Sequence, residues 1–175
     1  GMPAIIKPAT ATCYVTEACV RIMLDSGLLP KGVLQLVSGG IGDMLDHLDL
    51  QDIVTFTGSA NTALKLRGNE NILRNSIRFT AEQDSLNASV LGPDAQFGTP
   101  EFDLFVNEVQ REMTTKAGQK CTAIRRVLVP QGTSDVFIEA LGKRLANITL
   151  GDPREEGTKM GALVSNAQKN DVLEK

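Results

Sequence analysis

Short apolar runs alternate with amphipathic stretches along the first 90 residues. The runs that predict buried strands are residues 4–7, 33–37, 53–57 and 76–80. Between the first two runs, apolar side chains recur at helical spacing from Thr12, the expected N-cap, to Gly27, the expected end. One stripe of this helix is expected to face the core, and it consists of Val15, Cys19, Ile22 and Met23.

Further helices are expected between the later strands. A short helix should run through Met44, Leu45 and Leu48, and Ser59 is placed to cap a helix over residues 60–66. Strands that alternate with helices predict βαβ units around a parallel sheet. The fold class is therefore expected to be α/β.

Beyond residue 90 the pattern changes. A long helix is expected from Phe102 to Met113, because apolar residues recur there at offsets 0, 3, 4, 7 and 11. It should be followed by a strand over residues 123–129, a helix over residues 136–148 and a last helical stretch from Ser165. We therefore divide the chain near residue 85, into residues 1–85 and residues 86–175.

The composition argues against some classes of partner. The chain has 175 residues, with 18 Lys and Arg against 21 Asp and Glu, a net charge of −3, and 4% aromatic residues. This balance lacks the positive field and the stacking rings that nucleic-acid binding needs. No apolar run approaches the about 20 residues of a membrane-spanning helix, and the first residues lack the pattern of a signal peptide. We expect neither a nucleic-acid nor a membrane partner.

The cysteines are few and unpaired in the sequence. Cys13, Cys19 and Cys121 form no Cys-x-x-Cys pair, and His47 is the single histidine, so we expect no metal site. If Cys13 and Cys19 share a helix, about 9 Å separates them, beyond the about 7 Å reach of a disulfide. Free thiols favour a reducing cytoplasm. We interpret Cys13 and Cys19 as small buried apolar residues.

Two features at expected strand ends can carry chemistry. Thr57, Gly58 and Ser59 form a strand-to-helix turn, where backbone N–H groups and the helix dipole attract a phosphate. A turn that only caps the helix is the alternative. Glu82 ends the next strand and can act as a general base, although a solvated acid is the commoner role. The stretch Gly40-Ile41-Gly42 is a weaker phosphate-site candidate, because the third glycine of the dinucleotide-binding fingerprint is missing.

Cys121 is a further candidate. It lies between an expected helix and an expected strand, and four basic residues stand near it in the sequence: Lys116, Lys120, Arg125 and Arg126. Positive charge favours the thiolate, which is the nucleophilic form of cysteine. The alternative for a lone cysteine is a small buried apolar residue.

Together these residues resemble the aldehyde dehydrogenase superfamily over essentially the whole chain. The segments that carry the resemblance are, in order, Lys7-Pro8-Ala9, Phe56-Thr57-Gly58-Ser59, Glu82 and Gly118-Gln119-Lys120-Cys121-Thr122-Ala123. The last segment is the most specific. The strings from Glu82 to Asn87 and from Arg111 to Arg126 look most like the dehydrogenase half of bifunctional phenylacetate-degradation proteins of the PaaZ type. The resemblance implies a partial aldehyde-dehydrogenase-like fold, in which a parallel Rossmann-type sheet is followed by part of an α/β catalytic domain.

The resemblance also implies roles for individual residues. The Cys121 thiolate would attack an aldehyde, hydride would pass to a nicotinamide, and Glu82 would activate the water that hydrolyses the resulting thioester. The Cys121 N–H would form half of an oxyanion hole. Lys7 would reach the adenosine ribose of the cofactor. Thr57, Gly58 and Ser59 would line the cofactor site, the last two at the pyrophosphate.

Thr10 decides which cofactor we expect. Relatives that prefer NAD commonly have a glutamate three residues after the lysine, and its carboxylate repels a 2′-phosphate. Thr10 stands at that position, so we expect NADP, with NAD as the alternative. The expected substrate is a CoA-linked semialdehyde of aromatic-acid catabolism. It should be oxidised to the carboxylic acid, since relatives that pass the acyl group to CoA generally lack the acid that Glu82 supplies.

Some features of the family are altered or cannot be placed. Glu82-Gln83-Asp84-Ser85 stands for the usual Glu-Leu-Gly-Gly. An oxyanion asparagine upstream of Lys7 and a ribose-binding glutamate downstream of Cys121 cannot be located. We interpret the chain as an internal fragment of a homo-oligomeric parent and expect it to be inactive alone. Two alternatives stay open: a cytosolic thiol hydrolase that uses Cys121 with His47, and a catalytically silent binding or assembly module.

Overall fold

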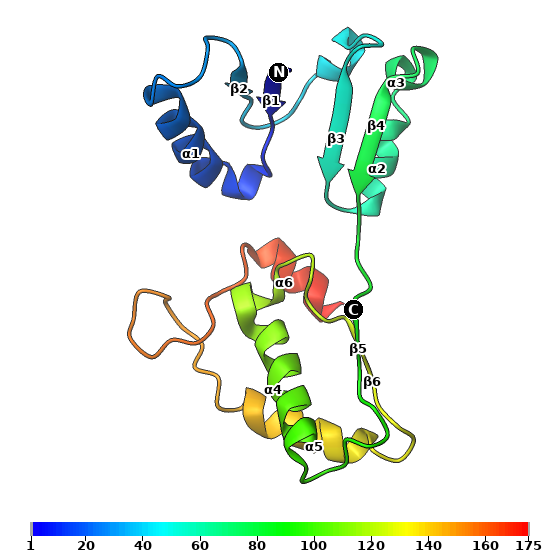
Figure 1. Cartoon of the computed structure of the whole chain (residues 1–175). Coiled ribbons are helices and arrows are strands. Elements are labelled where there is room, and N and C mark those ends of the chain that lie inside the picture. Colours follow the sequence, from blue (N-terminus) through cyan, green and yellow to red (C-terminus); the bar gives the residue numbers. More distant parts are fainter. Residues whose placement is uncertain (1, 175) are drawn as a thin grey trace. The chain divides into compact units, whose positions relative to one another are not determined.

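The computed structural model describes residues 2–174. The chain divides into two compact units, Gly1–Gln83 and Asp84–Lys175, and each is described by itself (Figure 1). The strands of the described residues form three parallel pairs and no continuous sheet. None of the described helices is both long enough and apolar enough to cross a membrane.

The N-terminal unit begins with a βαβ element. Strand β1 (Ala4–Ile6) pairs in parallel with β2 (Leu34–Leu36), and helix α1 (Cys13–Asp25) connects them. A short 3₁₀ turn, η1 (Thr10–Thr12), precedes the helix. The last residue of this turn is the N-cap of α1, as predicted, although its side chain makes no capping hydrogen bond.

A second parallel pair completes this unit. Its elements are the 3₁₀ turn η2 (Met44–His47), β3 (Ile53–Thr57), α2 (Ala60–Arg67), α3 (Glu70–Arg74) and β4 (Arg78–Glu82). Strands β3 and β4 pair along their whole length. Helix α3 lies in a segment for which the sequence pattern predicts no element. Strand β4 begins two residues later than expected, because Ser76 has a φ of 50° and turns the chain before the extended backbone starts.

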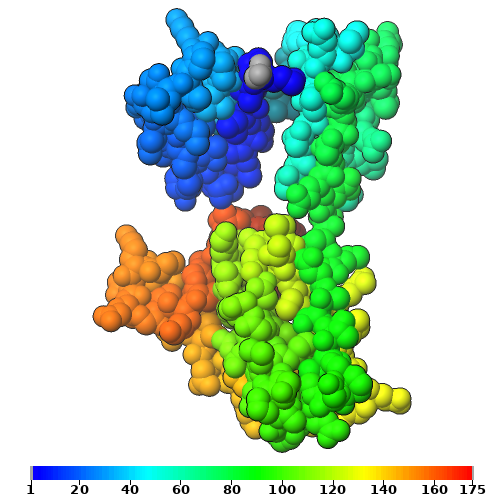
Figure 2. Space-filling view, in the orientation of Figure 1, coloured from blue at the N-terminus to red at the C-terminus, as the bar shows by residue number. Residues whose placement is uncertain are grey.

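The predicted apolar stripe of α1 is not buried. Val15 is 52% exposed and Ile22 is 71% exposed, whereas Val20, which lies outside the predicted stripe, is 4% exposed. Cys19 is exposed and Cys13 is half-buried, so the interpretation of both as buried residues is wrong. The physical reason is that no described element covers this face, and α1 forms part of the surface of its unit (Figure 2, blue).

The C-terminal unit contains the third strand pair and the longest helix. Its elements are β5 (Ala88–Val90), α4 (Pro100–Thr114), the 3₁₀ turn η3 (Thr115–Gly118), β6 (Arg126–Leu128), α5 (Ser134–Leu145) and α6 (Asn166–Leu173). Helix α4 is where the spacing of apolar residues predicts it. Strand β6 is shorter than the predicted residues 123–129, because its partner β5 offers only three residues for pairing.

The core of this unit lies along α4. Phe102, Val106 and Val109 are fully buried, at offsets 0, 4 and 7 of the helix. Leu91 and Phe137 from the chain on either side of α4 complete the buried cluster. This packing fixes α4, and with it the start of the segment that leads to Cys121.

Candidate active site

The carboxyl ends of β3 and β4 bring two predicted site segments together. Thr57 is the register partner of Glu82 across the parallel pair. The Gly58 N–H donates to the Glu82 carbonyl oxygen at 3.1 Å, one residue beyond the strand. The turn that was expected to bind phosphate and the expected general base therefore lie side by side at one sheet edge, which is where open parallel sheets place their ligands.

The turn after β3 has the geometry of a helix start. The Ser59 hydroxyl accepts from the Thr62 N–H at 3.3 Å, so Ser59 is the N-cap of α2. A Cβ at Gly58 would lie 2.6 Å from the Phe56 ring, so the ring occupies that side of the turn and glycine avoids the clash. Capping, the alternative drawn from the sequence, therefore occurs. Capping by Ser59 does not change the direction of the helix dipole, which still points its positive end at this turn. Phosphate binding at the turn therefore stays a prediction.

Lys7 and Thr10 lie at the end of the other strand pair. Lys7 directly follows β1, Thr10 opens η1, and both side chains are exposed. No hydrogen-bonded ladder among the described strands joins β1 to β3. The structure thus places Lys7 and Thr10 at a carboxyl strand end without joining them to Gly58 and Ser59.

Cys121 lies in the loop between η3 and β6. Its residue is exposed, so the alternative of a buried apolar cysteine is wrong for this position. Its carbonyl oxygen accepts hydrogen bonds from the Ser85 hydroxyl and the Asn87 amide, both at 2.6 Å. Within the described residues, neither the Cys121 N–H nor the Thr122 N–H donates to a protein acceptor. The backbone of the loop is held while the thiol and two N–H groups stay open.

A left-handed turn leads into this loop. Lys116, Ala117 and Gly118 have φ values of 53°, 54° and 70°, and such a backbone costs a residue other than glycine about 1–2 kcal/mol. A side chain at Gly118 would meet the Met113 carbonyl oxygen at 3.1 Å. The Gln119 amide then donates to the Lys116 carbonyl oxygen at 3.2 Å, which closes the turn.

Two of the four basic residues near Cys121 bind other groups of the protein. Lys120 forms an ion pair with Glu112 of α4 at 2.7 Å, with the two side chains 19% and 21% exposed. The Arg125 guanidinium donates to the Lys120 carbonyl oxygen at 3.3 Å. These residues were expected to favour the thiolate by their charge. Lys120 and Arg125 therefore anchor the loop through Glu112 and the backbone, and their effect on the thiolate stays a prediction.

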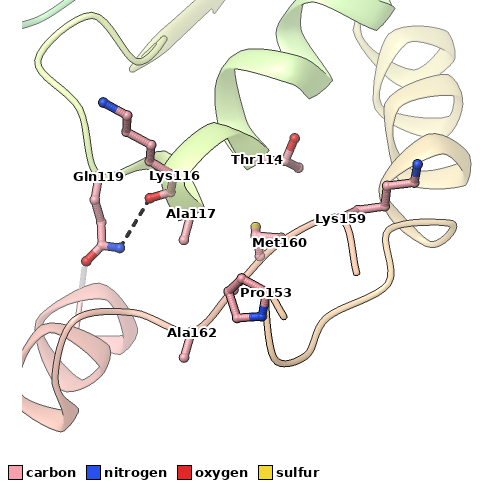
Figure 3. A pocket seen from close by; sticks show the side chains of 9 residues that line it. Thr114, Lys116, Ala117, Gln119, Pro153, Lys159, Met160 and Ala162 are labelled. Atoms are coloured by element: carbon pink, nitrogen blue, oxygen red, sulfur yellow. Dashed lines mark hydrogen bonds between the residues drawn. The ribbon is translucent and has the colours of Figure 1, made fainter. Parts of the chain in front are cut away.

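A hollow of about 400 Å³ lies beside the turn, and Cys121 is not among its lining residues. Gln119 lines it together with the segment around Met160 (Figure 3). The Val164 N–H donates to the Gln119 side-chain oxygen at 3.0 Å, which ties that segment to the cysteine loop. The side chains of Lys116 and Lys159 extend away from the middle of the hollow (Figure 3), so they do not converge on a common anion.

His47, which the thiol-hydrolase alternative requires, has a local partner. Its ring nitrogen lies 3.2 Å from the Asp43 carboxylate, four residues earlier. The hydrogen bond with His47, rather than burial, lowers the pKa of Asp43. Both residues are exposed in the N-terminal unit.

Sequence reasoning missed Ser85 and Asn87. A signal was present at Ser85, because the usual string has glycine there and a hydroxyl adds a hydrogen-bond donor. Asn87 gave no signal, because its acceptors at Cys121 and Ala123 are more than 30 positions away in the sequence.

Comparisons with known proteins give a consistent result. The profile of the aldehyde dehydrogenase family matches residues 1–175. The 3,4-dehydroadipyl-CoA semialdehyde dehydrogenase of Aromatoleum evansii is 48% identical over 174 residues, which cover 99% of this chain and 34% of that protein. The crystal structure of betaine aldehyde dehydrogenase from Staphylococcus aureus in complex with NAD+ matches with a TM-score of 0.83 and 29% identity, over 97% of this chain and 33% of that one. A double mutant of the same enzyme, also with NAD+, gives a TM-score of 0.83 at 28% identity, again over 97% and 33%. The chain spans about a third of the length of these relatives.

Proposed function

Because the chain belongs to the aldehyde dehydrogenase family, we propose that a protein carrying this segment oxidises an aldehyde to a carboxylic acid, with NAD(P) as the hydride acceptor. The observation that carries the proposal is the Cys121 loop, in which the carbonyl of the cysteine is held by two hydrogen bonds and its residue is exposed. A cysteine placed in this way can meet a substrate carbonyl, whereas a buried structural cysteine cannot.

The reaction would proceed in three steps on Cys121. The thiolate attacks the aldehyde carbon to give a thiohemiacetal, whose oxyanion is placed to accept hydrogen bonds from the unengaged N–H groups of Cys121 and Thr122. A nicotinamide held by the strand-end residues would supply the acceptor for the hydride that leaves this adduct, and Cys121 would then carry a thioester. Glu82 would take a proton from water as the water attacks the thioester, and the C–S bond would break to release the acid and return Cys121 to the thiolate.

The residues at the strand ends fit a dinucleotide. Gly58 places no side chain in the turn after β3, and α2 starts directly after it with Ser59 as its N-cap. This arrangement suits the approach of a pyrophosphate to the backbone. Lys7 and Thr10, exposed at the end of β1, would meet the adenosine ribose. On this proposal residues 1–85 belong to a cofactor-binding domain and residues 86–175 to a catalytic domain.

The proposed substrate is a CoA-linked semialdehyde of aromatic-acid catabolism, taken by a homo-oligomer. Support for the substrate comes from the relative of Aromatoleum evansii, whose name gives that chemistry, at 48% identity over 99% of this chain. Retention of Glu82 favours hydrolysis of the thioester over transfer to CoA.

The test is an assay of the full-length protein that carries this segment. Incubated with a CoA-linked semialdehyde and NADP, it should reduce one nicotinamide for each carboxylic acid formed, as followed by absorbance and mass spectrometry. Alkylation of Cys121 should abolish the reaction, and aldehyde or NADP should slow that alkylation. Alkylated protein that keeps full activity would overturn the proposal.

Exchange of Thr10 for glutamate should reverse the cofactor preference. A carboxylate at this position repels the 2′-phosphate of NADP and accepts the 2′-hydroxyl of NAD, so kcat/KM for NADP should fall about 10- to 100-fold against that for NAD. The measurement is steady-state kinetics of the full-length protein with each cofactor. Thr16→Glu, a substitution of the same type within α1, is the control and should leave the ratio unchanged. A wild-type protein that uses NAD as well as NADP would contradict the assignment.

A further inference from the structure

The backbone on both sides of Cys121 is restrained by hydrogen bonds. The donations from Ser85 and Asn87 to the Cys121 carbonyl oxygen, each at 2.6 Å, hold the peptide group that follows its Cα. The donation from Arg125 to the Lys120 carbonyl oxygen holds the peptide group that precedes it. With both peptide groups restrained, φ and ψ of Cys121 are set, and rotation about the Cα–Cβ bond is the freedom that the thiol keeps.

Asn87 is the centre of this network. Its amide donates to the Ala123 carbonyl oxygen at 3.0 Å as well as to that of Cys121. The backbone carbonyl oxygen of Asn87 accepts from the backbone N–H groups of Arg125 at 2.9 Å and Arg126 at 3.1 Å. Asn87 is half-buried, so water competes less for these bonds than it does at an exposed side chain. One residue thus connects both ends of the segment from Cys121 to β6.

Ser85 adds a bond that the usual sequence string cannot make. Where Glu-Leu-Gly-Gly has a glycine, this chain has a half-buried hydroxyl directed at the Cys121 carbonyl oxygen. The Asn87 amide nitrogen lies 3.1 Å from the same hydroxyl, so its two N–H groups are shared among three acceptors, and the hydroxyl proton is left for the carbonyl. The two side chains therefore support one another at a single acceptor.

We propose that Ser85 and Asn87 are positioning residues that fix the peptide group of Cys121, and thereby direct its thiol and its N–H at one substrate carbonyl. The inference rests on the proposed role of Cys121 as nucleophile. Neither side chain touches the substrate; both act through the cysteine backbone. The effect should be large, because displacing a reacting group by about 1 Å can cost about 100-fold in rate.

The experiment compares two rates in the full-length protein. One is the first-turnover reduction of NADP by aldehyde, which needs the thiol and the N–H to be aligned with one carbonyl. The other is alkylation of Cys121 by iodoacetamide, a small reagent that can approach the thiolate from any open side. Loss of positioning slows the first rate and spares the second, whereas loss of fold or of the thiolate slows both.

The expected result is a split between the two rates. Asn87→Ala should lower the first-turnover rate about 10- to 100-fold. Ser85→Ala, which removes one of the two donors to the Cys121 carbonyl oxygen, should lower it about 3- to 10-fold. Ser85→Thr keeps the hydroxyl and should restore most of the rate. Alkylation should stay within about twofold of wild type in all three variants.

Two control variants remove the same kinds of bond elsewhere. Asn147→Ala removes an amide donation of 2.9 Å to the Lys143 carbonyl oxygen. Ser26→Ala removes a hydroxyl donation of 2.6 Å to the Met23 carbonyl oxygen. Both should leave the two rates unchanged, because neither bond reaches the cysteine loop.

Two outcomes would overturn the inference while leaving the proposed function intact. One is an unchanged first-turnover rate in Asn87→Ala and Ser85→Ala. The other is an equal fall of the first-turnover and alkylation rates, which would make the role structural. If Asn87→Ala does not fold, Ser85→Ala and Ser85→Thr decide the matter. Failure of the proposed function is recognised separately, because wild-type protein would then not oxidise aldehyde, and the inference would fall with it.

Discussion

Replacement of Cys121 by serine is expected to lower aldehyde oxidation by the full-length protein by about 10⁴-fold or more. A neutral hydroxyl is a far weaker nucleophile than a thiolate, and removal of a nucleophile ordinarily costs an enzyme several orders of magnitude in kcat. The variant should still bind NADP, because the cofactor residues proposed above lie in the other unit. Steady-state turnover and cofactor binding by fluorescence titration give the two measurements.

Cys19→Ser is the matched control for this prediction. Cys19 is also an exposed free thiol, on α1, and it has no part in the proposed site. This variant should keep wild-type turnover. If Cys121→Ser retained turnover within about tenfold of wild type, covalent catalysis at this position would be ruled out.

Exchange of Glu82 for glutamine is expected to slow steady-state turnover about 10²- to 10⁴-fold and to leave a first burst of nicotinamide reduction. Glutamine keeps the shape of the side chain at the end of β4 but cannot take a proton from water. Attack by Cys121 and the hydride step do not need that proton transfer, so the thioester should accumulate. Stopped-flow absorbance measures the burst, and intact-protein mass spectrometry detects the acyl group on Cys121.

Glu70→Gln provides the comparison for this variant. Glu70 is an exposed acid at the start of α3, where it pairs with Arg74 across one helical turn, and its loss should leave turnover unchanged. A Glu82→Gln protein with wild-type steady-state rate would assign water activation to another group. One that loses the burst as well would place Glu82 before the hydride step.

Local sequence signals predict elements well where both ends are marked. Strand β3 occupies the predicted residues 53–57, because its β-branched run is closed by Gly58 and Ser59. Helix α4 follows from its apolar spacing, and the structure adds the cap at Thr99, whose hydroxyl accepts from the Phe102 N–H. Helix α3 was missed because it has only five residues, too few for an apolar spacing to show.

Burial and long-range contacts could not be obtained in this way. The stripe of α1 has the spacing of a core face, yet Ile22 is exposed, because spacing records which residues share a face and not what covers it. The motifs indicated Cys121 and Glu82 as site residues, and their chemical roles stay predictions. The contacts of Ser85 and Asn87 with the cysteine loop depend on how β5 and β6 pair, which no local pattern contains.

The left-handed turn before Cys121 makes this loop unusual in how it can change during evolution. Surface loops ordinarily accept inserted or deleted residues. Here a left-handed turn follows α4 and consists of Lys116, Ala117 and Gly118. The side-chain amide of Gln119 donates to the carbonyl oxygen of Lys116, the first residue of that turn. One residue more or fewer would rotate the sulfur away from its present side of the unit. Homologues of this chain should therefore differ in the residue types of this segment but keep its length.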